Sequence, residues 1–285
     1  MINKKNFLKN AFVLMLGTSI LVSCKKDQLS DEESELTTSE DHSFMESTFN
    51  DVGNIADEAA SMGDLISYKT SSETDALLGL CVKVSRDTVS ESPTKILTID
   101  FGSVNCVCKD GRSRRGKIIV KHTGQYLDSG ATKIVTFDNY FVNDNQVTGT
   151  RTVTNNGHNT SNNLNWTITE KGSIVLVSGA GKISWDSYRN RELIAGESTL
   201  ELSDNEYSIT GKASGVNAKN LAYTANITSP LIRKMTLGCR KHFVKGTIVM
   251  TPSGKLARTI DFGNGECDNL ATVSINGKSK QITLR

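Results

Sequence analysis

Two patterns of apolar and polar residues divide this chain. Between residues 43 and 63 apolar side chains recur every three or four positions, which predicts an amphipathic helix. Ser43 and Glu46 have the spacing of a capping box at its start, and Gly63 marks its end. The polar face of this helix is acidic, so we expect it to pack on a sheet rather than on a surface of anionic lipid, which is the alternative for an amphipathic helix.

From Leu78 to the C-terminus the pattern changes to alternation, which predicts about a dozen or more antiparallel strands and no second helix. A sheet of that size must twist and curl. We therefore expect an all-β fold, a large curled antiparallel sheet that forms an open barrel or a sandwich, with the N-terminal helix packed on it. This single β domain spans residues 42–285. Turn-forming residues separate the strands at 143–145, 155–157, 171–172, 203–205 and 276–277.

One hairpin motif occurs twice. The pentad Thr-Ile-Asp-Phe-Gly stands at 98–102 and at 259–263, and in each copy a cysteine follows four residues after the glycine. A proline lies near the midpoint of each cysteine-bracketed segment, 81–106 and 239–267, where a hairpin reverses. Strands that run out and back from these turns bring the two cysteines of each copy opposite one another. The expected disulfides join Cys81 to Cys106 and Cys239 to Cys267, and Cys108 is left as a free thiol.

Within the pentad we expect the phenylalanine to point inward, the aspartate to point outward or to cap a turn, and the glycine to permit a bulge before the cysteine. Protein kinases contain the same Asp-Phe-Gly triplet, but this chain lacks the His-Arg-Asp loop and the glycine-rich strand that accompany it. Two related halves of one sheet, or one useful hairpin used twice, would each explain the repeat. Cys106 and Cys108 with His122 would suit a soft metal. We favour the disulfide, because Cys267 repeats Cys106 without a second cysteine, and we expect no metal or cofactor.

The first residues have the features of an export signal. Three lysines precede the apolar stretch 11–22, which is too short to span a bilayer, so residues 1–23 are predicted to be a signal peptide. Its last residues, Leu21-Val22-Ser23-Cys24, resemble the lipobox of bacterial lipoproteins. The resemblance implies that Cys24 is lipidated and anchors the mature chain in the outer membrane, facing either the periplasm or the cell surface. Residues 24–41 are polar and acidic, and we expect them to form a flexible tether.

The charge of the chain limits its partners. The formal charge is +2, and removal of residues 1–23 takes away three lysines and no acid, which leaves −1. This excludes a global basic field for nucleic acid. Basic residues nevertheless gather near the two cysteine-bracketed hairpins, where they would form one anion-binding patch if the hairpins are neighbours. The alternative is a charged edge that keeps strands from pairing. These residues are Lys109, Arg112, Arg114, Arg115, Lys117, Arg240 and Lys241.

The lipobox, the acidic segment, the repeated Asp-Phe-Gly-x3-Cys and the long Asn/Thr-rich β region together resemble hypothetical lipoproteins of Bacteroidota, a family that implies no activity. Asp87-Thr88-Val89 resembles the short O-glycosylation motif of exported Bacteroidota proteins, so we expect a sugar on Thr88. No catalytic residue stands out. We expect a non-enzymatic binding or envelope-structural protein whose partner is an anionic glycan or an envelope protein. The alternatives are a glycan-acting hydrolase and a carrier of lipids or lipoproteins.

Overall fold

The computed structural model describes residues 26–61, 77–87, 94–124, 127–177, 179, 181–199 and 201–284. The expected signal peptide, Cys24 and Thr88 lie outside these residues, so what we expect of them stays a prediction. Within the described part, no helix is long and apolar enough to cross a membrane.

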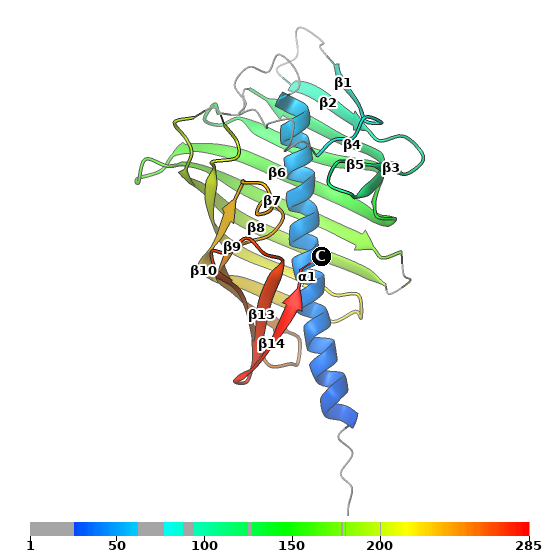
Figure 1. Cartoon of the computed structure of the whole chain (residues 1–285), viewed down its shortest axis with the longest axis vertical. Coiled ribbons are helices and arrows are strands. Elements are labelled where there is room, and N and C mark those ends of the chain that lie inside the picture. Colours follow the sequence, from blue (N-terminus) through cyan, green and yellow to red (C-terminus); the bar gives the residue numbers. More distant parts are fainter. Residues whose placement is uncertain are drawn as a thin grey trace, which may run out of the picture.

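A single antiparallel sheet of 14 strands makes up most of the fold (Figure 1). The strands follow one another in chain order, except that the short β3 pairs only with β4, and β1 and β14 form the two open edges. The expected all-β class, with one N-terminal helix packed on a large curled sheet, is confirmed. The strands are β1 (Lys83–Asp87), β2 (Thr94–Asp100), β3 (Cys106–Val107), β4 (Ser113–Thr123), β5 (Thr132–Val142), β6 (Asn145–His158), β7 (Leu164–Val175), β8 (Lys182–Ala195), β9 (Glu206–Val216), β10 (Ala222–Lys234), β11 (Lys245–Pro252), β12 (Arg258–Asn264), β13 (Leu270–Ile275) and β14 (Lys278–Thr283).

The helix α1 (Lys26–Ser61) lies across the inner face of the sheet (Figure 1). It contacts β2 and β4 near one end of the strand order and β11 near the other, so the sheet curls around it. Every side chain between residues 36 and 60 is buried or half-buried. The acidic face of the helix is therefore covered by the sheet as well as its apolar face.

The helix begins at Lys26 rather than at Ser43, where the capping box placed its start. Ser43 does not cap it, because its Oγ is buried without a hydrogen-bond partner among the described residues. Glu46 is bonded to Arg189 of β8 instead. A capping box was thus the wrong interpretation of a Ser-x-x-Glu sequence that lies in the middle of a long helix.

The prediction of a flexible tether at 24–41 is wrong from Lys26 onward, since these residues are helical. Two polar side chains in this segment, Thr38 and Asp41, have partners in the β9–β10 turn. Asn217 Nδ2 donates to Thr38 Oγ1 at 2.7 Å, and the backbone N–H of Ala218 donates to Asp41 Oδ2 at 3.0 Å. A polar composition predicts disorder only when its groups must be solvated, and here Asn217 and Ala218 supply hydrogen bonds to two of them.

The centre of the core is an aromatic cluster around Phe49 of α1. Its ring packs edge-on against Phe137 and at a tilt against Trp185, with centroids 6.0 and 5.8 Å away. Gly172 of β7 lies directly beneath this ring, and a Cβ added there would stand 2.2 Å from Phe49 Cζ. The prediction of a turn at 171–172 is wrong, because this glycine lies inside a strand and makes room for the helix.

The turn predicted at 155–157 is also wrong. Asn155 and Gly157 lie within β6, where the pairing with β7 shifts register between them. The Asn155 Oδ1 accepts a hydrogen bond of 2.7 Å from the Gly157 N–H, which stabilises the resulting bulge. The other three turns, at 143–145, 203–205 and 276–277, separate consecutive strands as expected.

Both cysteine-bracketed hairpins are present. β1 pairs with β2 and β11 pairs with β12, and the structure joins Cys81 to Cys106 and Cys239 to Cys267 while Cys108 is free and buried.

The Asp-Phe-Gly triplets have the structural role expected of them. Asp100 Oδ1 accepts from the Gly102 N–H at 2.8 Å, and Asp261 Oδ1 accepts from the Gly263 N–H at 2.9 Å. Both glycines have positive φ, 83° and 91°, a region that other residues rarely adopt. The two phenylalanines, Phe101 and Phe262, are buried.

Candidate functional site

Two of the basic residues near the first hairpin, Arg112 and Arg114, turn toward the helix. Arg114 is completely buried, and its Nη2 lies 2.7 Å from both Asp51 Oδ2 of α1 and Asp110 Oδ2. Arg112 lies 3.2 Å from the same Asp51 carboxylate. The expectation that Arg114 binds an external anion is corrected here, because its charge is already matched and water has no access to it.

Strand β10 contributes a base to the same stretch of helix. Arg233 donates to Asn50 Oδ1 at 3.1 Å and to Asn54 Oδ1 at 2.6 Å, and its Nε donates to the carbonyl of Arg240 at 3.2 Å. Arg240 is itself buried, so it too is withdrawn from the expected anion-binding set. Basic residues at β4 and in β10 therefore converge on residues 50–54 of α1, and they serve as internal partners there.

Further buried pairs link α1 to the middle of the sheet. Arg189 is bonded to Glu46, and Lys133 to Asp57. Burial lowers the pKa of Lys133 despite the neighbouring carboxylate of Asp57. Because each of these strands presents a base where the helix presents an acid, the network fixes the rotation and axial position of α1 and is structural in character.

His42 belongs to the same internal layer. Its ring meets Trp185 and Tyr223 edge-on, with centroids 5.7 and 5.6 Å away. Complete burial lowers its pKa to about 4, against the raising influence of Glu46, so the imidazole is neutral at pH 7. It holds aromatic neighbours in place and does not act as a charged ligand.

The remaining members of the expected anion-binding set are scattered. Arg115 is bonded to Asp144 and lies 3.9 Å above the Phe141 ring, and Lys117 pairs with Asp100 at 3.2 Å. Lys109 is exposed and Lys241 is half-buried, and for these two the expectation stays untested.

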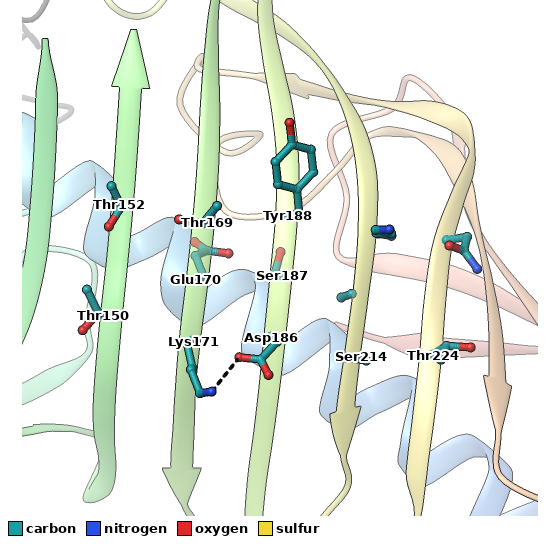
Figure 2. Close-up of a pocket in the computed structure, with 13 residues that line it drawn as sticks. Thr150, Thr152, Thr169, Glu170, Lys171, Asp186, Ser187, Tyr188, Ser214 and Thr224 are labelled. Carbon is teal, nitrogen blue, oxygen red and sulfur yellow. Dashed lines mark ion pairs between the residues drawn. The ribbon is translucent and has the colours of Figure 1, made fainter. Parts of the chain in front are cut away.

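A different site lies on the face of the sheet opposite α1. In β6 to β10 one face of each strand carries the buried residues, and the other carries polar side chains. There they line a groove of about 730 Å³, shown in Figure 2. We call it the outer groove, and its outward-facing residues are Thr150, Thr152, Thr169, Lys171, Asp186, Tyr188, Lys212, Ser214, Thr224 and Asn226.

The outer groove is rich in hydrogen-bonding groups and has one exposed ring. Tyr188 is 49% exposed although it lies in the interior of β8. Lys171 and Asp186 approach to 3.9 Å, but with side chains 85% and 59% exposed this pair contributes little to stability. Glu170 also borders the groove, yet its carboxylate is buried and bonded to Arg151. Asp186 is therefore the one exposed carboxylate among the residues that line the outer groove.

Sequence reasoning missed this site for a specific reason. Threonine, serine and asparagine at alternating positions read as the solvated side of a strand, which is what most of them are. The signal that was available is Tyr188, an aromatic residue at an outward position among polar ones. Its neighbours on other strands become known only from the pairing register.

No family model, curated protein or solved structure matches this chain. The fold and the site instead define the class in physical terms. It is an open antiparallel sheet wrapped around an internal helix, with a polar groove that contains an exposed aromatic ring on its outer face.

Proposed function

We propose that this protein is a lipid-anchored, non-enzymatic envelope protein that binds a glycan in its outer groove. The observation that carries the proposal is the exposed ring of Tyr188 surrounded by hydroxyl, amide and amine groups. The C–H-rich face of a sugar ring packs against an aromatic ring, while its hydroxyl groups exchange hydrogen bonds with Ser, Thr, Asn and Lys side chains. The outer groove offers both kinds of contact side by side.

Two observations favour binding over the alternatives. Glycoside hydrolysis generally requires two carboxyl groups across the scissile bond, and the residues that line the outer groove supply one exposed carboxylate, Asp186. A lipid carrier requires an apolar space on the inner face of the sheet, where residues 36–60 of α1 are packed instead.

Replacing Tyr188 with alanine is expected to weaken glycan binding about tenfold, which corresponds to about 1.4 kcal/mol, because the stacking surface is lost. Binding should be measured by isothermal titration with soluble polysaccharides and oligosaccharides. Ile194→Ala is the matched control, because Ile194 is exposed on the same strand but lies outside the groove. Equal binding by Tyr188→Ala and the parent, with both folds confirmed by circular dichroism, would contradict the proposed site.

Replacing Cys24 with serine is expected to release the protein from the membrane fraction or to block its processing, because serine cannot carry the thioether-linked lipid of a lipoprotein. Membrane fractionation and intact-mass measurement of the mature protein test this. Cys108→Ser is the control, since Cys108 is a buried free thiol that a lipid cannot reach. Unchanged fractionation of Cys24→Ser would remove the anchor from the proposal. A lipid on Cys24 would be attached two residues before the start of α1 at Lys26.

A further inference from the structure

We infer that the ligand of the outer groove is an acidic polysaccharide, a chain that contains uronic acid residues and lies across the strands rather than along them. This inference rests on the proposed function and specifies the substrate class and its orientation. Three features of the site lead to it: the pairing register, the extent of the groove and the balance of its charges.

The register places the groove residues in rows that cross the strands. Tyr188 of β8 is paired with Thr169 on one side and with Lys212 on the other. Thr169 is paired in turn with Thr152, and Lys212 with Asn226. Since neighbouring strands lie about 4.8 Å apart, this row of five side chains is about 19 Å long. A linear polymer that follows the row meets a new polar side chain at every strand.

A second row runs parallel to the first, two residues further along each strand. It consists of paired residues from the same five strands, in the order Thr150, Lys171, Asp186, Ser214 and Thr224. A neighbouring space of about 650 Å³ shares the last four of these residues and continues to Thr251 and Ser253. The site is therefore long in the direction across the strands, which suits several linked sugar units better than a single one.

The charges of the groove favour an acidic chain. Lys171 and Lys212 stand against one exposed carboxylate, that of Asp186, which approaches Lys171. Among the described residues no carboxylate forms an ion pair with Lys212. Side chains directly opposite one another on paired strands have Cβ atoms about 5 Å apart. A sugar ring stacked on Tyr188 therefore presents its substituents to Lys212, whose ammonium group is able to pair with a ring carboxylate.

The test compares oligogalacturonates of increasing length with neutral gluco-oligosaccharides of the same lengths, by isothermal titration. Lys212→Ala is expected to weaken binding of the acidic series about tenfold and to leave any binding of the neutral series unchanged. Affinity for the acidic series should rise with chain length until the chain spans the row, and it should fall as salt is raised, because charge pairs at an exposed site are screened. Lys182→Ala is the matched control, since Lys182 is exposed on β8 outside the groove.

The outcomes separate this inference from the proposed function. If acidic and neutral chains bind with equal affinity and Tyr188→Ala weakens both, the inference of an acidic ligand is wrong and the proposed glycan site is supported. Equal losses in Lys182→Ala and Lys212→Ala, or competition by polyphosphate at matched charge, would reduce the effect to surface charge and also overturn the inference. Absence of parent binding to both series and to the other polysaccharides tested would contradict the proposed function itself.

Discussion

Replacing Arg114 with methionine is expected to lower the free energy of unfolding by about 3–5 kcal/mol, the range found when one partner of a buried ion pair is removed. Arg114 is fully buried and bonded to Asp51 and Asp110, so its loss leaves two carboxylates without their shared partner. Chemical denaturation monitored by circular dichroism measures the change. The control is Lys171→Met, which removes an exposed pair and should cost less than about 1 kcal/mol.

The pH dependence of the free energy of unfolding of Arg114→Met tests whether loss of the buried ion pair causes the destabilisation. In the parent protein burial alone would raise the pKa of Asp110, but hydrogen bonds and charge from Arg114 outweigh it and hold that pKa below its usual value. Without Arg114 the buried carboxyl should have a raised pKa, so its protonated form is favoured in the folded state. The stability deficit of Arg114→Met should therefore shrink as the pH falls from 7 toward 4. A deficit below 1 kcal/mol, or one that does not change with pH, would show that the buried pair is not what Arg114 contributes.

Replacing Phe49 with alanine is expected to cost about 3–5 kcal/mol, because it removes the fully buried ring at the centre of the helix–sheet interface and leaves a cavity. Gly172→Ala should cost about 1–3 kcal/mol by itself, because the added methyl group overlaps that ring. In the Phe49→Ala background the same methyl group enters the vacated space. The double variant should therefore be more stable than the sum of the two single losses predicts, by about 0.5–3 kcal/mol.

A second glycine of the sheet, Gly215, provides the control for the Phe49 and Gly172 double variant. A Cβ at Gly215 would also be crowded, but by the Ser184 carbonyl at 2.4 Å and the Tyr223 ring rather than by Phe49. Gly215→Ala should therefore add to Phe49→Ala without compensation. Additive losses for Gly172 and Phe49 would mean that the helix does not approach the sheet as closely as the structure shows.

Much of the fold follows from short-range information. Alternation identifies the strands because successive side chains of a strand point to opposite faces. Asn143 and Asp144 predict the β5–β6 turn because they tolerate positive φ, and both adopt it. The two hairpins are predictable because each cysteine pair brackets two alternating segments with a proline near their midpoint, and the Asp-Phe-Gly triplets because the aspartate caps an amide only two residues away.

The wrong predictions arise because the same local sequence can serve more than one structure, and pairing or contact with other parts of the chain selects between them. Lys171-Gly172 and Asn155-Asn156-Gly157 have the local chemistry of turns, yet both lie inside strands. The first provides space for Phe49, more than 100 residues away in the chain, and the second forms a bulge. Thr38 and Asp41 likewise lie in a segment whose composition predicts solvation, whereas Asn217 and Ala218 bond to them.

The strands, three of the five turns, the apolar face of the helix and the cysteine pairs are predictable from the amino-acid sequence, because each depends on residues that are near in the chain. Which charges are internal and which polar side chains gather into a site depends on how the sheet curls around the helix. An acidic helix and basic strands each look solvated alone, and their charges become partners when the curl of the sheet brings Asp51 to Arg114. In the same way Tyr188 and Lys212 are 24 residues apart and become neighbours only through the register of β8 with β9, which no local pattern encodes.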